Sequence, residues 1–212
     1  MSRRRGRFLV LEGLDGAGTT TQSRLLAGRL RRAGRRVHLT AEPSGGPVGA
    51  LLRQVLSGRV GGGGGEGFDS SALALLFAAD RLDHHAAEIA PRLAEGTDVV
   101  SDRYTLSSLA YQSLTTGDAA WVERLNARAP APDLTLFLRV RPAVAGRRRF
   151  AESGSRELYE VPAFQRRVAR AYERSLELLR RRGERVVVVD GEGAVEAVAE
   201  AVLAAVAPFA GA

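Results

Sequence analysis

Short runs of apolar residues alternate with longer amphipathic segments along this chain of 212 residues. The apolar runs lie at about residues 7–12, 36–41, 97–102, 134–140 and 185–190, and they are rich in Leu and Val. Such runs predict buried β-strands, and the segments between them have the spacing of helices. Strands joined through helices predict a parallel sheet covered on both faces, with ligands at the carboxyl ends of the strands.

The first and last apolar runs are the most continuous. Residues 9–11 and the four valines at 186–189 contain no polar side chain, which predicts that both strands are central and fully buried. We see no internal repeat and no second core, so residues 1–212 are expected to form one α/β domain with about five parallel strands. The glycines at 61–65 predict a surface loop between two helices, without a functional role.

A glycine-rich turn follows the first predicted strand and opens an amphipathic helix. Backbone N–H groups and a helix N-terminus converge there, an arrangement that binds phosphate. Gly13, Gly18 and Thr20 match the pattern G-x-x-x-x-G-K-[ST], but Thr19 stands where that pattern has lysine. The residues expected to bind nucleotide phosphate are Gly13, Leu14, Asp15, Gly16, Ala17, Gly18, Thr19, Thr20 and Thr21.

The composition makes arginine the only strong cation. The sequence contains no lysine, so all 31 basic residues counted as Lys or Arg are arginine. Arginine binds phosphate through a planar fork, whereas lysine acts as a point charge. The net charge of +7 does not indicate nucleic-acid binding, because the arginines are spread over several segments without stacking aromatic residues. We interpret most of them as solvated surface charge.

Several classes of protein are disfavoured by residue content. The absence of cysteine excludes a disulfide framework and a thiolate metal site. The N-terminal segment lacks the apolar run of a signal peptide, and no segment has the length and apolarity of a membrane span. A cytoplasmic protein without membrane contact is therefore expected. The neighbouring His84 and His85 point to different sides of a predicted helix, which favours structural roles.

Two oxygen-bearing side chains are candidates for a metal site. Asp102 ends the third predicted strand, where a carboxylate can help to hold Mg²⁺. Thr20 supplies the hydroxyl that a phosphate loop offers to the metal. The alternative is that Asp102 caps the following helix and has no metal role.

Five further segments carry polar residues that secondary structure by itself does not require. They are Glu42-Pro43, residues 77–81, residues 102–104, residues 107–112 and the arginine-rich stretch near 147. Together with the loop, these segments resemble the thymidylate kinase family from Phe8 to about Asp190. The resemblance implies a three-layer P-loop NTPase-type fold, transfer of the γ-phosphoryl group of Mg-ATP to dTMP, and a homodimer.

The resemblance also implies roles for individual residues. Arg103 would grip the acceptor phosphate, and Asp15 would accept a hydrogen bond from the sugar 3′-hydroxyl, although Asp15 is also a plausible turn residue. Phe77 would stack on thymine, with a core position as the alternative, and Arg81 would bind a thymine carbonyl. Tyr111 would exclude ribonucleotides unless it is a half-buried helix residue. The base and sugar would also meet Glu42, Pro43, Ser108 and Gln112.

Three cationic positions of the family are altered here. Thr19, Ala41 and Leu158 replace the loop lysine, an arginine before Glu42-Pro43 and a lid arginine. The lid itself is expected at about residues 146–160, bracketed by two glycines. The resemblance places Arg148 on adenine and leaves Arg149 or Arg156 for the γ-phosphate. We hypothesise that a lid arginine replaces the lysine.

Two other functions remain open at this stage. A nucleotide-binding regulator of the same fold is favoured by the missing lysine and disfavoured by the complete acceptor site. A kinase for another monophosphate or a deoxynucleoside is the second alternative. The apolar residues of the third predicted helix would form either a dimer interface or core; they are Leu73, Leu75, Leu76 and Ala79.

Overall fold

The computed structural model describes residues 4–61, 67–153 and 162–210. Its centre is a sheet of five strands in the order β2-β3-β1-β4-β5, in which all neighbouring strands are parallel. The strands are β1 (Phe8–Gly13), β2 (Val37–Ala41), β3 (Asp98–Asp102), β4 (Leu134–Arg139) and β5 (Val186–Asp190). The predicted α/β class, the strand number and the positions of the strands are confirmed.

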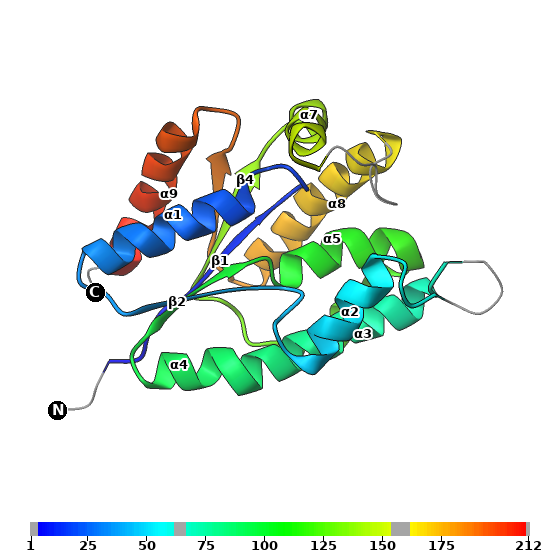
Figure 1. Ribbon diagram of the computed structural model, residues 1–212, viewed down its shortest axis with the longest axis horizontal. Coiled ribbons are helices and arrows are strands. Elements are labelled where there is room, and N and C mark those ends of the chain that lie inside the picture. The colour runs from blue at the N-terminus through cyan, green and yellow to red at the C-terminus, as the bar shows by residue number, and fades with distance from the viewer. Residues whose placement is uncertain (1–3, 62–66, 154–161, 211–212) are drawn as a thin grey trace.

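Helices cover both faces of the sheet, which gives three layers (Figure 1). Helices α1 (Thr19–Arg32) and α9 (Val195–Ala210) lie on one face, and α4 (Ala90–Ala94), α5 (Thr105–Thr116) and α8 (Pro162–Arg181) on the other. The other helices in the described ranges are α2 (Pro47–Leu56), α3 (Ser70–His84), the π-helix η1 (His85–Ile89), α6 (Ala119–Leu125) and α7 (Pro142–Ser153). This arrangement is that of a P-loop NTPase-type fold.

The prediction that the last strand is central was wrong, because β5 lies at an edge of the sheet. Val186, Val187 and Val188 are only half-buried, whereas all six residues of β1 are buried. Both α8 and α9 contact β5 and cover its two faces. A run of valines is therefore needed at this edge too, and composition cannot distinguish a covered edge strand from a central one.

The phosphate loop packs directly against α7. Gly16 has a φ angle of 84°, and a Cβ atom at this position would lie 2.2 Å from the carbonyl oxygen of Ala145. Only glycine combines this left-handed backbone with so close an approach. The loop between β1 and α1 is thereby fixed against the helix that leads to the predicted lid.

The first residues of the predicted lid, 146–153, belong to helix α7. Helix α7 starts at Pro142, so Gly146 is an interior helix residue. Proline is favoured in the first turn of a helix, where its missing N–H has no partner to lose. The expected lid residues Gly154, Arg156 and Leu158 lie outside the described residues.

Two further features concern the remaining surface. The predicted glycine loop connects α2 and α3, as expected, but residues 62–66 lie outside the described ranges. In the part of the chain that the structure describes, no helix has both the length and the apolarity needed to span a bilayer.

Candidate active site

The phosphate loop joins β1 to α1 through a tight turn. The Ala17 N–H donates to the Leu14 carbonyl over 2.9 Å, and Gly18 forms the N-cap of α1 with a φ angle of 92°. Because glycine has no side chain, the N-cap residue does not cap the first turn of α1 with a side-chain hydrogen bond. Successive glycines with positive φ and an uncapped helix N-terminus direct amide hydrogens towards one point, which is the geometry of an anion site.

Thr19 and Thr20 face opposite environments at the start of α1. The Thr19 side chain is buried, with its methyl carbon near Gly13, whereas Thr20 is exposed and its hydroxyl donates to Oδ2 of Asp102. The second carboxylate oxygen of Asp102 is buried and has no hydrogen-bond partner among the described residues. Tyr104 is the N-cap residue of α5, so the alternative that Asp102 caps this helix was wrong.

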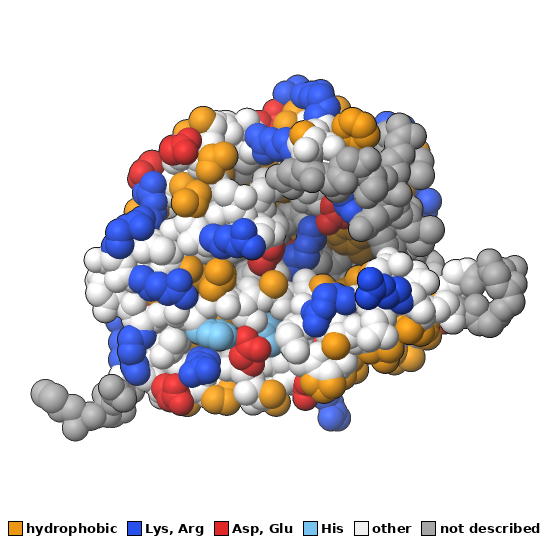
Figure 2. All heavy atoms as spheres, in the orientation of Figure 1, with side chains coloured by type: hydrophobic (Ala, Val, Ile, Leu, Met, Phe, Trp, Pro, Cys, Tyr) orange, Lys and Arg blue, Asp and Glu red, His pale blue; other side chains and the backbone are white. Residues whose placement is uncertain are grey.

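A cavity of about 590 Å³ opens beside the loop. The hollow is visible at the centre of the molecule, with arginine and acidic side chains on its floor (Figure 2). Its lining contains every residue predicted to bind the acceptor, together with one lid arginine. These residues are Asp15, Glu42, Pro43, Phe77, Arg81, Arg103, Ser108, Tyr111, Gln112 and Arg149.

One end of the cavity is charged. Nη2 of Arg103 lies 2.6 Å from Oδ1 of Asp15, and Nη1 of Arg149 lies 2.9 Å from Oδ2 of the same carboxylate. About a fifth of each arginine side chain remains exposed, so both guanidinium groups are accessible from the cavity. Two cations on one anion leave this end with net positive charge, which suits a phosphate.

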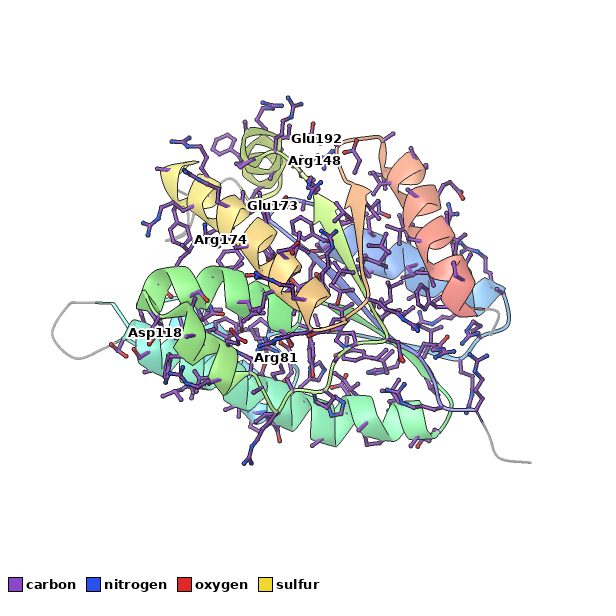
Figure 3. All side chains as sticks on the ribbon, turned by 180° about the vertical axis from the view of Figure 1, so that it is seen from behind. Arg81, Asp118, Arg148, Glu173, Arg174 and Glu192 are labelled. Carbon is purple, nitrogen blue, oxygen red and sulfur yellow. The ribbon has the colours of Figure 1, made fainter. Side chains whose placement is uncertain are left out.

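The opposite end is built around Arg81, which is fully buried (Figure 3). Its Nη1 donates to Ser108 over 3.1 Å and to Asn126, and its Nη2 donates to Glu42 over 2.6 Å and to the Tyr104 carbonyl over 3.1 Å. A guanidinium group has five N–H bonds. The fifth, on Nε, is buried and has no partner among the described residues.

A second buried contact supports the carboxylate of Glu42. Nδ1 of His84 lies 3.4 Å from Oε1 of Glu42, and Nε2 lies 2.8 Å from the Thr40 hydroxyl. Burial opposes a charge on His84, but the hydrogen bond and charge of Glu42, aided by Glu88 and Asp80, raise its pKa. The structural role predicted for His84 therefore fits its surroundings.

Apolar residues of α2, α3 and the segment between them close the cavity. They are Val55, Leu56, Val60, Phe68 and Leu73. Phe77 packs in this cluster, as the core alternative predicted, and it also lines the cavity. Gly61 and Gly67 lie in the lining as well. The predicted loop is thus flanked by cavity residues, which the expectation of no functional role did not foresee.

Tyr111 separates the charged end from the helices behind it. Its ring is 8% exposed, lies 6.0 Å edge-on from the Tyr172 ring, and is covered by the Arg103 guanidinium at 5.8 Å. Burial raises the pKa of Tyr111, so its hydroxyl stays protonated. The ring occupies a fixed position in the cavity wall.

Arg148 belongs to a different surface from the cavity. Its guanidinium donates to the carbonyls of Gly191 and Glu192 over 2.7 and 3.0 Å, and Arg148 lies beside Glu192 (Figure 3). These contacts tie α7 to the segment between β5 and α9. Arg148 and Arg149, although adjacent in sequence, therefore reach two separate regions.

Three residues of the site, the buried Glu12 and Tyr172 and the half-buried Ser107, were not predicted. Glu12 accepts hydrogen bonds from the backbone of Tyr104 and Ser107, and the hydroxyls of Ser107 and Tyr172 contact Arg103. Burial raises the pKa of Glu12 to about 7, although its hydrogen bonds and Arg103 oppose the shift. A lone carboxylate in an apolar strand signals a required partner, whereas Tyr172 has no sequence signal that distinguishes it from core.

Comparison with known proteins agrees with this architecture. A profile of the family described as thymidylate kinase matches residues 11–202. A putative thymidylate kinase of Aeropyrum pernix is 42% identical over 192 residues, which cover 90% of this chain and 88% of the relative. A thymidylate kinase of Thermomicrobium roseum is 41% identical over 94% of this chain and 93% of its own length. A probable thymidylate kinase of Pyrococcus horikoshii is 40% identical over 82% and 84%.

The fold and the phosphate loop define a nucleotide-binding protein of the P-loop class. The family profile spans most of the chain, and the relatives are similar over nearly their whole lengths, so the assignment can be narrowed from the P-loop class to one family. The chain belongs to the thymidylate kinase family.

Proposed function

We propose that this protein transfers the γ-phosphoryl group of ATP to dTMP and releases dTDP and ADP. The observation that carries this proposal is the cavity beside the phosphate loop, which gathers all nine residues expected to bind the acceptor. The cavity has a cationic end at Arg103, and its other end combines the buried Arg81 with apolar walls, which suits the phosphate and the base of a nucleotide.

The acceptor is proposed to lie with its phosphate at Arg103 and its base at Arg81. Asp15, whose carboxylate pairs with Arg103 in the free protein, accepts a hydrogen bond from the sugar 3′-hydroxyl. The unpaired Nε–H of Arg81 supports its role at a thymine carbonyl, because a buried donor without a partner is unfavourable until a ligand supplies one.

The walls of the cavity are proposed to select the sugar and the base. The rigid ring of Tyr111 fills the space that a ribose 2′-hydroxyl would need, and Phe77 stacks on the base. Ser108 and Gln112 offer polar groups to the base edge, while Glu42 and Pro43 complete the wall.

The donor nucleotide is proposed to lie across the loop, with adenine near Arg148. The amides of residues 13–21 cradle its phosphates, as the positive φ angles of Gly16 and Gly18 favour. Thr19 occupies the place of the family's loop lysine, and its buried side chain offers no charge to a phosphate. The loop, the cavity and the lid then act as parts of one domain, residues 1–212.

Thr20 and Asp102 are proposed to hold Mg²⁺. The buried, unpaired Oδ1 of Asp102 and the adjacent Thr20 hydroxyl fit a hard cation that completes its shell with water and phosphate oxygens. Within the described residues no group of three or more His, Cys, Asp or Glu forms an all-protein metal site, which agrees with this sharing. When bound, Mg²⁺ supplies positive charge to the donor phosphates.

Arg149 is our choice for the cation that replaces the lysine. It is the described lid arginine that lines the cavity, and it meets the loop at Asp15. Arg156 stays a second candidate, and it lies outside the described residues. When the acceptor hydroxyl binds Asp15, Arg149 can turn from this carboxylate to the phosphate that is transferred.

The reaction needs no general base, because the attacking oxygen of the dTMP phosphate is already an anion. This oxygen forms a bond to the γ-phosphorus as the bond from that phosphorus to the bridging oxygen of ADP breaks. Arg103 orients the acceptor, and Arg149 neutralises the charge on the transferred group. Positioning and charge compensation supply the catalysis.

The test is an assay of the purified protein with Mg-ATP and dTMP, dUMP or thymidine. We expect the largest kcat/KM with dTMP. Preferred turnover of dUMP or thymidine would select the kinase for another nucleotide. Tight binding of dTMP and ATP without turnover would select the regulator and reject the proposed reaction.

Dimerisation through α3 is proposed as a separate property. Leu73 belongs to the core. Leu75 and Leu82 of the same helix are 50% and 38% exposed, and Ala79, which lies between them in sequence, is exposed as well. Apolar side chains are visible over α2 and α3 at the lower right of Figure 2. Light scattering should report a dimer that Leu75→Glu converts to monomer, and a monomeric wild type would refute the proposal.

A further inference from the structure

Three elements that are distant in sequence meet behind Arg103. They are the end of β1 with Glu12 and Gly13, the first turn of α5 with Ser107, and the middle of α8 with Tyr172. Tyr172 is fully buried, and its hydroxyl donates to the Gly13 carbonyl over 2.9 Å. It also lies 3.0 Å from the Ser107 hydroxyl and 3.2 Å from Nη1 of Arg103.

The contacts of Glu12 fix the direction of these hydrogen bonds. Its Oε1 accepts from the Tyr104 and Ser107 amides over 2.8 and 3.1 Å, and its Oε2 accepts from the Ser107 hydroxyl over 2.5 Å. A serine hydroxyl has a single hydrogen. Since Ser107 gives that hydrogen to the Glu12 carboxylate, its oxygen is left to accept from Nη1 of Arg103. The Tyr172 hydroxyl gives its own hydrogen to the Gly13 carbonyl, so its oxygen likewise accepts from Nη1.

The two terminal nitrogens of Arg103 therefore have different surroundings. Nη1 faces three acceptors, at 3.1 Å for the Gly13 carbonyl, 3.0 Å for Ser107 and 3.2 Å for Tyr172. Nη2 contacts the carboxylate of Asp15 at the cavity. The hydrogens of Nη1 are committed to the protein, whereas Nη2 can exchange Asp15 for a ligand.

The backbone of Arg103 also requires support. Its φ angle of 74° is the only positive value recorded for a non-glycine residue in the described ranges, and this region is unfavourable for a residue with a Cβ atom. The N–H of Arg103 donates to the Leu11 carbonyl over 2.8 Å, and the carbonyl of Arg103 accepts from the Ser101 hydroxyl over 2.8 Å. Such a conformation persists where the surroundings over-determine it.

We propose that Tyr172 and Glu12, acting through Ser107, are positioning residues that lock Nη1 of Arg103 and so present Nη2 to the acceptor phosphate. Neither side chain lies in the cavity lining. Tyr172 contacts Arg103 directly, and Glu12 contacts it through Ser107. This inference rests on the proposed function for the identity of the ligand. Burial raises the pKa of Tyr172, which keeps the hydroxyl in its donating form.

The test compares Tyr172→Phe with wild type in steady-state kinetics at pH 8, above the pKa of about 7 of Glu12. Phenylalanine removes one oxygen and keeps the buried ring. Because Arg103 retains its other partners, we expect a fall of about tenfold in kcat/KM for dTMP, with the KM for ATP changed by less than about twofold. Glu12→Gln should have the same signature, since an amide cannot accept all three hydrogen bonds.

A double-mutant cycle separates positioning from packing. If Tyr172 acts through Arg103, the Tyr172→Phe change should have almost no further effect in the Arg103→Ala background. Ser113→Ala is the control, because its buried hydroxyl on α5, the helix that carries Ser107, has no partner among the described residues. It should leave kcat/KM unchanged in both backgrounds.

Two results would overturn the inference. One is an unchanged kcat/KM in Tyr172→Phe and Glu12→Gln, even if their melting temperatures fall. The other is a fall in kcat/KM on Tyr172→Phe that is equally large in the wild-type and the Arg103→Ala backgrounds. If wild type binds dTMP but does not turn it over, the proposed reaction fails, and the same cycle read as Kd for dTMP by calorimetry still decides the positioning role.

Discussion

The proposed acceptor cavity and the phosphate loop stabilise charge in different ways. In the cavity, Arg81 and Arg103 are each held by a carboxylate and by several neutral acceptors, so their positions are fixed before a ligand binds. At the loop, Thr19 brings no charge, and the nearby Arg149 comes from α7, a different element. The proposed acceptor side is thus preorganised by burial, whereas the proposed donor side depends on a group carried by the predicted lid.

The largest expected effect is the loss of the cation at the centre of the acceptor side. Arg103→Ala should lower kcat/KM for dTMP by about 10³-fold, because it removes the proposed phosphate contact and leaves Asp15 without one of its partners. Steady-state kinetics check this. Arg174→Ala, an exposed arginine on α8, is the control and should behave as wild type (Figure 3). Similar rates in both variants would show that the cavity does not bind the acceptor phosphate.

The next effect tests the donor side of the comparison. Arg149→Ala should lower kcat by about 10²-fold, since a positioned cation at the transferred phosphoryl group is lost. Introducing Thr19→Lys into this variant should restore part of the rate, because it returns a cation to the loop. Arg180→Ala, at the exposed end of α8, should have no effect. A wild-type rate in Arg149→Ala would show that Arg149 is not the cation that replaces the loop lysine.

A smaller effect concerns the sugar. Tyr111→Ala should raise the ratio of kcat/KM for 5-methyluridine monophosphate over dTMP by about tenfold, because the ring no longer fills the space of the 2′-hydroxyl. The absolute rates for both substrates should fall, since the ring also packs against Arg103. Tyr111→Phe keeps the ring and should keep the wild-type ratio. An unchanged ratio in Tyr111→Ala would contradict the steric role.

The smallest expected effect is on the free energy of unfolding, and it concerns His84, which supports Glu42 at the proposed base end of the cavity. The pKa of His84 is raised in the folded protein, so its contribution is present below the unfolded value of about 6.5 and is lost as pH rises through the folded value. His84→Asn should therefore cost about 1 kcal/mol in the free energy of unfolding at pH 6 and less at pH 9. Urea unfolding at both pH values checks this. A cost that grows with pH would have the wrong sign.

Much of the candidate site could be predicted because its residues stand in local patterns. The glycine-rich turn, Asp102 after an apolar strand and the pair Phe77 and Arg81 on one helix face each occupy a few neighbouring positions. Glu12 and Tyr172 could not be predicted in the same way. They meet Arg103 across separations of about 90 and 70 residues, and only packing brings such positions together.

The sequence by itself determined the alternation of strands and helices, the phosphate loop and the residue types of the acceptor site, because hydrophobic periodicity and turn chemistry act over short stretches of chain. Tertiary structure decided that β5 is an edge strand, that α7 begins at Pro142, and that Arg148 and Arg149 reach different regions. It also decided which nitrogen of Arg103 is committed to the protein. These properties depend on what packs against each residue, and a residue's own position in the chain does not contain that information.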